Sequence, residues 1–415
     1  MTETEIKAPR VMLAAVDLGE YDASQSLDEL EELAQTAGAE TVIRIIQRRP
    51  SFDSATCIGS GRLEEIAEIC EREEIDQIIF DHELTATQIR NIEAVCNVHT
   101  IDRTMLILDI FAQRATTHEG RLQVEIAQHR YRLPRLAGMG IKLSRLGAGI
   151  GTRGPGESKL ETDKRHIRTR ISALNQELKE IEKRRANHRA RRKKDGVLIC
   201  AIVGYTNVGK STLLNRLTEA GVLAENKLFA TLETTSRSIE LPDGRSVMLV
   251  DTVGLIRRLP HHLVEAFKST LEEAANADVI LHVCDASADN CEEQAKVTLE
   301  LLSQLGCEGI PVVTVLNKCD KVPYIDEIGL EENVVKISAR NGDGIDGLLL
   351  AIQAALPQSA IRTKLLLPFD KAGLVNLIRK DGKVFSEEYV AEGILLDALV
   401  DIKVFSKVEE YKWNM

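Results

Sequence analysis

The sequence feature that most constrains this chain is a glycine-rich loop between an apolar strand and a helix. The loop reads Gly204-Tyr205-Thr206-Asn207-Val208-Gly209-Lys210-Ser211, which fits the pattern G-x-x-x-x-G-K-[ST]. The apolar run Val197–Val203 precedes it, and a helical pattern over Thr212–Thr218 follows. Glycines let backbone N–H groups wrap around phosphates, and the following helix N-terminus adds positive partial charge. The pattern therefore predicts an α/β domain that binds nucleotide phosphates.

Within this loop, the residue types assign separate roles. Lys210 is expected to reach the β- and γ-phosphates, and the Ser211 hydroxyl to ligate Mg²⁺. A second motif, Asp251-Thr-Val-Gly254, ends the apolar strand predicted over Ser246–Asp251. We expect Asp251 to hold Mg²⁺ through water and the Gly254 N–H to meet the γ-phosphate.

A third motif predicts which base is bound. Asn317-Lys318-Cys319-Asp320 matches N-K-x-D and follows another apolar strand. The two acceptor oxygens of Asp320 suit the N1–H and N2–H donors of guanine, whereas adenine would leave a buried carboxylate unpaired. Ser338-Ala339-Arg340 follows the strand Val334–Ile337 and could support the base through backbone N–H groups. These motifs in this order resemble a GTPase G domain, here about residues 196–357, with GTP and GDP as substrate and product.

Two positions bear on hydrolysis. A threonine between the phosphate loop and Asp251 should close over Mg²⁺ and the γ-phosphate; Thr231 is favoured, with Thr234 and Thr235 as alternatives. The predicted catalytic residues are thus Lys210, Thr231 and Gly254. The residue after D-x-x-G is Leu255, where many GTPases place a glutamine that orients the attacking water. Intrinsic hydrolysis is therefore expected to be slow, and another group or a partner must order the water.

The charge distribution separates the chain into three blocks. The net charge is −11, but residues 1–120 carry 10 basic and 24 acidic side chains, a net of −14. Residues 121–194 carry 21 basic and 7 acidic side chains (net +14), and residues 195–415 carry 22 and 33 (net −11). A basic block between two acidic ones can bind a polyanion locally.

Hydrophobic periodicity predicts the fold class, a multidomain α/β protein. Four strands (Arg10–Asp17, Thr41–Arg48, Gln77–Asp81, Val98–Ile101) alternate with three helices (Ser26–Thr36, Gly61–Glu73, Thr85–Val95), which indicates a parallel sheet. A helical pattern over Arg103–Arg135 and a helix over Glu157–Lys194 predict a long antiparallel hairpin with a glycine-rich tip. In the second helix, Ile167, Ile171, Leu174, Leu178 and Ile181 keep a 3.5-residue rhythm.

The predicted boundaries give four parts: an α/β subdomain (1–102), the basic hairpin (103–195), the G domain (196–357) and a small α+β domain (358–415). Further strands are expected at Val279–Asp285 and Pro311–Asn317. No run of 18 apolar residues and no signal peptide are present, so we expect a cytoplasmic protein without stable membrane insertion. The eight scattered cysteines fit reduced, buried thiols.

A longer stretch of sequence indicates one family among the GTPases. Residues Leu143–Arg165, with Gly59-Ser-Gly-Arg62 and Phe229-Ala-Thr-Leu232, resemble the signature of HflX-type GTPases over about residues 10–357. Small departures are Leu146, Ala148, Ser158 and Lys164. The resemblance implies binding to the large ribosomal subunit and its RNA, GTP-dependent ribosome splitting or rescue under stress, and a monomer off the ribosome. It also allows ATP binding at Gly59–Arg62, although a structural turn is the simpler interpretation there.

The basic hairpin supplies the candidate RNA contacts. They are Arg145, Arg153, Arg184, Arg185, Arg189, Arg191 and Arg192. Few acidic residues accompany the cluster after Arg184, which favours RNA contact, while a solvated helix face is the alternative. Two other functions remain open: an RNA-binding adaptor with little hydrolysis, and a GTPase of RNA modification or membrane traffic. Missing membrane signals and the glycine-tipped hairpin disfavour the last.

Overall fold

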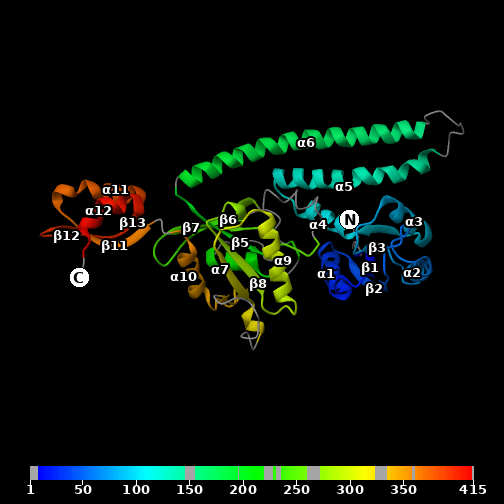
Figure 1. Cartoon of the computed structure of the whole chain (residues 1–415), viewed down its shortest axis with the longest axis horizontal. Helices are drawn as coiled ribbons and strands as arrows, with labels where there is room; N and C mark the ends of the chain where they lie inside the picture. The colour runs from blue at the N-terminus through cyan, green and yellow to red at the C-terminus, as the bar shows by residue number, and fades with distance from the viewer. Residues whose placement is uncertain are drawn as a thin grey trace, which may run out of the picture. The chain divides into compact units, whose positions relative to one another are not determined.

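The structure is a computed structural model that describes residues 8–144, 155–194, 196–218, 228–229, 235–258, 272–322, 334–357 and 360–413. The described residues form two compact units. The first contains residues up to His188, together with Leu228, Phe229 and Arg258. The second contains the remaining described residues. Figure 1 colours the chain from the N-terminus to the C-terminus.

The first unit contains a four-stranded parallel sheet in the order β2-β1-β3-β4. Its strands are β1 (Arg10–Asp17), β2 (Glu40–Arg48), β3 (Gln77–Phe80) and β4 (His99–Asp102). The intervening helices are α1 (Ala23–Thr36), α2 (Ser60–Arg72) and α3 (Ala86–Cys96). These elements confirm the predicted alternation to within a few residues. Met12 and Ala14 of β1 pack with Leu63, Ile66 and Ile92 of α2 and α3 in one buried core.

The predicted uninterrupted helical pattern over residues 103–135 is wrong at one place. The chain forms α4 (Arg103–Arg114) and then α5 (His118–Ser144). Ala115 is extended, with φ −68° and ψ 109°, and the Thr117 hydroxyl accepts the Gly120 N–H at the start of α5. A threonine at this place stabilises a new helix start better than the interior of a continuous helix.

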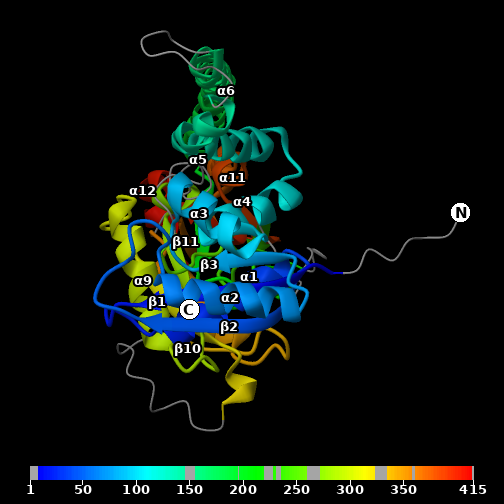
Figure 2. The ribbon, with the colours of Figure 1, turned by 90° about the vertical axis from the view of Figure 1, so that its right-hand side faces the viewer.

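The long helical hairpin is present in the first unit. Helix α6 (Pro155–Lys194) runs antiparallel beside α5 (Figures 1 and 2). Leu122 and Ile126 of α5 bury against Leu174 of α6, with Leu178 and Ile181 packed alongside. The apolar stripe of α6 therefore faces α5, as its 3.5-residue rhythm predicts.

The second unit holds a six-stranded sheet in the order β10-β9-β8-β5-β7-β6. All neighbouring strands are parallel except β6, which is antiparallel to β7. The strands are β5 (Leu198–Gly204), β6 (Thr235–Glu240), β7 (Ser246–Asp251), β8 (Val279–Asp285), β9 (Val312–Asn317) and β10 (Val335–Lys336). The helices are α7 (Lys210–Thr218), α9 (Cys291–Gln304) and α10 (Ile345–Ala355). Sequence periodicity did not predict β6, because Ile239 is its one buried residue.

A three-stranded antiparallel sheet completes this unit, in the order β11-β13-β12. It comprises β11 (Ala360–Leu367), β12 (Lys383–Val390) and β13 (Gly393–Asp401), with α11 (Gly373–Asp381) and α12 (Ile402–Val408). Val375 and Ile378 of α11 and Val404 of α12 pack on Leu365 and Leu396. Among the described residues, no helix combines the length and apolarity needed to cross a bilayer.

Candidate nucleotide-binding site

Two glycines of the phosphate loop stand where no side chain fits. Gly204 is the last residue of β5, and a Cβ atom there would lie 2.2 Å from the Val283 carbonyl oxygen. Gly209 has φ +96°, and its Cβ would lie 2.4 Å from Asn317 Nδ2. Close approach of neighbouring groups therefore requires glycine at both ends of the loop.

Lys210 opens α7 and is buried, with 6% of its surface exposed. Its Nζ donates to the carbonyl oxygens of Tyr205 at 2.7 Å and Gly204 at 3.2 Å. Burial lowers the pKa of Lys210 to about 8, while the negative charge of Asp251 opposes that shift. The ammonium is thus held at the mouth of the loop whose N–H groups would surround phosphates.

Ser211 and Asp251 meet although they are 40 residues apart. The Ser211 hydroxyl donates to Asp251 Oδ2 at 2.9 Å, and Asp251 is fully buried at the end of β7. A hydroxyl and a carboxylate are the oxygen ligands that Mg²⁺ prefers. These two residues therefore fit a magnesium site. A Cβ atom on Gly254 would lie 3.1 Å from Lys210 Nζ, which places Gly254 at the same edge of the sheet.

The N-K-x-D motif is tied to the phosphate loop by side chains. Asn317 Nδ2 donates to the Val208 carbonyl at 2.8 Å, and its Oδ1 accepts the Ala339 N–H at 2.9 Å. Lys318 Nζ donates to the Asn207 carbonyl at 2.8 Å and to Asp285 Oδ2 at 2.5 Å. Motifs from three segments of the chain therefore form one rigid loop cluster.

Asp285 belongs to this cluster, although the sequence patterns did not single it out. It ends the apolar strand β8, which lies beside β9 in the parallel sheet. A carboxylate at the carboxyl end of a strand next to the N-K-x-D strand is the signal that could have identified it.

Asp320, the carboxylate expected to read the base, lies beside the loop Ser338–Arg340. Ser338 Oγ donates to Asp320 Oδ1 at 2.7 Å, and this hydrogen bond lowers the pKa of Asp320. Asp320 is therefore ionised at neutral pH and can accept hydrogen bonds. The Arg340 carbonyl accepts a hydrogen bond from Arg216, which holds the Ser338–Arg340 loop against α7.

Leu255 extends the pairing between β5 and β7 beyond the strands. Its N–H donates to the Gly204 carbonyl at 3.1 Å, and its carbonyl accepts the Thr206 N–H at 2.8 Å. Two residues later, the Arg257 N–H donates to the Tyr205 hydroxyl at 2.6 Å. Leu255 is itself buried. The segment after Gly254 is therefore fastened to the phosphate loop by its backbone.

Of the three threonines considered as the residue that closes over Mg²⁺, the structure describes Thr235. Thr231 and Thr234 lie outside the described residues. Thr235 begins β6 and pairs with Asp251 in the antiparallel register. The choice among the three threonines therefore stays a prediction.

The candidate RNA residues differ in their partners. Arg145 and Arg153 lie outside the described residues. Arg185 forms an ion pair with Glu119 at 3.0 Å, and Arg189 lies 3.4 Å from Glu272 and 3.7 Å from Glu273. Arg184 and Arg191 are exposed on α6, and Arg192 is half-buried. The charge run is thus partly used for packing the helix.

At the Gly59-Ser-Gly-Arg62 turn, Gly59 is the N-cap of α2 without a side-chain cap. Its N–H donates to Gln47 Oε1 at 2.9 Å, and Arg62 pairs with Glu65. These contacts account for the turn structurally, and ATP binding there stays a prediction.

A phosphate loop, a D-x-x-G segment and an N-K-x-D loop at the carboxyl edge of one mainly parallel sheet define the class of P-loop GTPases. Three families match in succession: GTP-binding GTPase N-terminal (residues 24–112), GTP-binding GTPase Middle Region (114–192) and 50S ribosome-binding GTPase (199–318). The GTPase HflX of Lacrimispora saccharolytica is 48% identical over 406 residues, covering 97% of this chain and 96% of that protein.

The GTPase HflX of Caldanaerobacter subterraneus is 47% identical and covers 99% of this chain and 95% of its own length. A crystal structure of SsGBP in complex with GDP is 26% identical, with a TM-score of 0.48, covering 84% of this chain and 98% of that one. The chain belongs to the HflX family of GTPases. The resemblance found in the sequence is thereby confirmed.

Proposed function

We propose that this chain hydrolyses GTP and that its nucleotide state controls binding to the large ribosomal subunit, with ribosome splitting or rescue under stress as the outcome. One observation carries the proposal. Three hydrogen bonds, Ser211–Asp251, Asn317–Val208 and Ser338–Asp320, bring the residues proposed to bind metal, phosphate and base to one sheet edge. The family supports the ribosome as partner, since 50S ribosome-binding GTPase is the name of the matching domain.

Each residue of the site has a separate role in the proposed reaction. Lys210 would exchange its carbonyl partners for phosphate oxygens, and its positive charge would stabilise the negative charge that develops on the γ-phosphate. Ser211 and, through water, Asp251 would hold Mg²⁺, which would supply positive charge to the phosphate oxygens. The Gly254 N–H donates to the γ-phosphate. Asp320 accepts the guanine N1–H and N2–H donors, which selects GTP over ATP.

The basic hairpin supplies the ribosomal contact in this proposal. Arg184 and Arg191, which are exposed on α6, can neutralise RNA phosphates, and the ion pairs of Arg185 and Arg189 hold the helix in place. Arg145 and Arg153 at the glycine-rich tip are proposed as further RNA contacts. The free thiols fit a cytoplasmic site of action, where ribosomes work.

Sedimentation of ribosomes tests this function. Purified 70S particles are mixed with the chain plus GTP, a non-hydrolysable GTP analogue or GDP. Co-sedimentation with large subunits, and a rise in free subunits with the analogue or GTP only, is the expected result. Lys210→Ala is the matched control and should neither bind nor split. Equal binding in all nucleotide states would contradict the proposal.

One observation favours a second candidate. Leu255 is buried and its side chain carries no hydrogen-bonding group, so that side chain cannot orient the attacking water. An RNA-binding adaptor that uses GTP as a structural ligand would have such a site. Ribosome-stimulated phosphate release separates the two functions, because an adaptor releases none.

A further inference from the structure

The carboxyl edge of the sheet in the first unit holds a buried carboxylate. In the order β2-β1-β3-β4, strand β1 is flanked by β2 on one side and β3 on the other, so the connections diverge between β1 and β3. In open parallel sheets this is where a ligand crevice forms. Asp81 and His82 directly follow β3 here, and the Asp81 side chain is fully buried.

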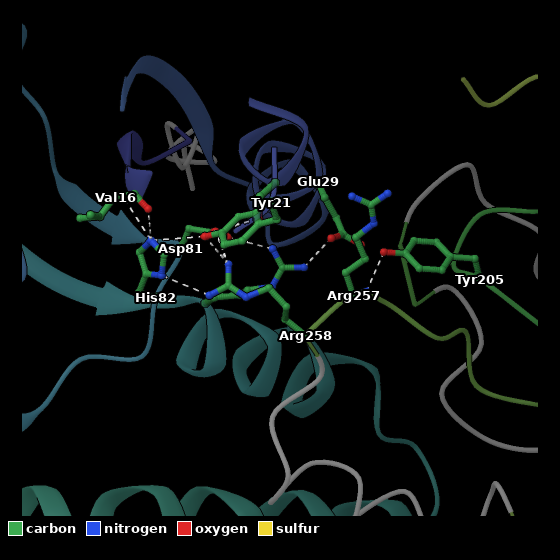
Figure 3. A network of polar contacts seen from close by, with 10 residues as sticks. Val16, Tyr21, Glu29, Asp81, His82, Tyr205, Arg257 and Arg258 are labelled. Atoms are coloured by element: carbon green, nitrogen blue, oxygen red, sulfur yellow. Dashed lines mark hydrogen bonds and ion pairs between the residues drawn. The ribbon is translucent and has the colours of Figure 1, made fainter. Parts of the chain in front are cut away.

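An arginine of the same chain binds at this edge of the sheet. Arg258 Nη1 donates to Asp81 Oδ2 and to the Tyr21 hydroxyl, both at 2.7 Å, and Nη2 lies 3.1 Å from His82 Nδ1 (Figure 3). Its guanidinium carbon also lies 4.6 Å from the centroid of the Tyr21 ring. The five fixed donors of a guanidinium match such a fork of acceptors better than an ammonium does.

The acceptors are themselves held in place. Arg103 binds the other carboxylate oxygen of Asp81 at 3.0 Å, and Ser26 Oγ donates to Oδ2 at 2.7 Å. Burial, followed by the charge of Arg258, lowers the pKa of His82 to about 4. His82 Nδ1 faces Arg258, and its Nε2 lies 3.0 Å from both the Val16 backbone nitrogen and the Val16 carbonyl oxygen. The Asp81 carboxylate is therefore held in place to accept the Arg258 guanidinium.

Arg258 lies only four residues after Gly254. Its backbone has φ +51°, a left-handed conformation that a non-glycine residue keeps only when surrounding contacts hold it. Arg258 belongs to the first unit, as do Tyr21, Asp81 and His82. Within the first unit, Arg258 is held by Asp81, Tyr21 and His82.

We propose that Arg258 is a positioning residue for GTP hydrolysis, and that Asp81, Tyr21 and His82 form its receptor. The Leu255 side chain has no group that can hydrogen-bond the attacking water. The position of the main chain after Gly254 therefore decides the reaction geometry. Small displacements of reacting groups reduce rates strongly. This inference rests on the proposed hydrolysis of GTP.

The test compares steady-state GTP hydrolysis, in the presence of large subunits, for the wild-type chain, Arg258→Ala, Arg258→Lys and Tyr21→Phe. Arg258→Ala should lower kcat roughly 10-fold or more with KM within about 2-fold, because GTP itself is bound by other residues. Arg258→Lys should recover part of kcat. Arg44→Ala, which removes an exposed arginine paired with Asp28 on the same unit, is the matched control.

Tyr21→Phe removes one hydroxyl and keeps the ring. It should lower kcat by a smaller factor and have no further effect in the Arg258→Ala background, since the two groups act together. Equal kcat in wild type and Tyr21→Phe, or additive losses in the double variant, would overturn the inference even if Arg258→Ala failed to fold. Absence of hydrolysis by the wild-type chain would instead overturn the proposed function.

Discussion

Asn317 donates a hydrogen bond from its side-chain amide to the carbonyl of Val208, at 2.8 Å, and so joins the N-K-x-D motif to the phosphate loop. The same amide accepts the Ala339 N–H. A single side chain therefore sets the spacing between the loops expected to hold the base and the phosphates.

Asn317→Ala should destabilise the chain and weaken GTP binding together. It leaves the buried Val208 carbonyl and Ala339 N–H without the partner that Asn317 provides, which costs about 1–3 kcal/mol per group. Urea unfolding and titration with a fluorescent GTP analogue measure the two effects. Asn91→Ala is the control, because the side-chain amide of Asn91 donates an exposed hydrogen bond to the Ala55 carbonyl. Equal losses in both variants would contradict the bridging role.

Burial of Lys210 should make the stability of the folded chain depend on pH. Its pKa is lowered by burial from 10.5 to about 8, so between these values the unfolded chain binds more protons than the folded chain. Stability contributed by this residue therefore rises as pH increases from about 8 to 10.5, and is lowest below pH 8. Without nucleotide, wild type should gain about 1–2 kcal/mol relative to Lys210→Met between pH 7.5 and 9.5. Parallel pH curves would contradict burial of the ammonium.

Asp320→Asn should change the base that is bound. An amide presents a donor where guanine needs an acceptor, so GTP affinity should fall roughly 10-fold or more while xanthosine triphosphate gains. Competition binding with GTP, ATP and xanthosine triphosphate measures the change. Asp370→Asn is the control, because Asp370 is an exposed carboxylate shortly after β11. Unchanged preference for GTP would refute the assignment of Asp320.

Arg184→Gln should weaken ribosome binding and reduce its dependence on salt. Removing one arginine–phosphate ion pair makes the slope of log affinity against log salt shallower by about 0.7–0.9. Arg185→Gln should change this slope less, since Arg185 is paired with Glu119. Binding measured at several salt concentrations distinguishes them. Identical slopes for wild type and Arg184→Gln would identify the charge run as a solvated face.

Much of the fold follows from local patterns. Strands β1, β7 and β8 have the predicted bounds, because each is a short apolar run ended by an aspartate. The three nucleotide motifs are equally local, since each lies at one strand end. Strand β6 has too little apolar content to be predicted, and the break after α4 depends on the extended backbone at Ala115.

Contacts between distant residues are the part that sequence did not predict. Arg258 and Asp81 are 177 positions apart, and nothing in either local pattern pairs them. The Lys318–Asp285 ion pair follows only once β8 and β9 are known to be neighbours. Sequence patterns indicate which side chains stand at strand ends, whereas strand order decides which of them meet.

Phosphate release from GTP, measured with and without purified large subunits, small subunits and 70S ribosomes, shows whether the large subunit stimulates hydrolysis. We expect slow release by the chain alone, strong stimulation by particles that contain the large subunit, and no stimulation with Lys210→Ala. Fast release by the isolated chain, unchanged by any ribosomal particle, would contradict this expectation.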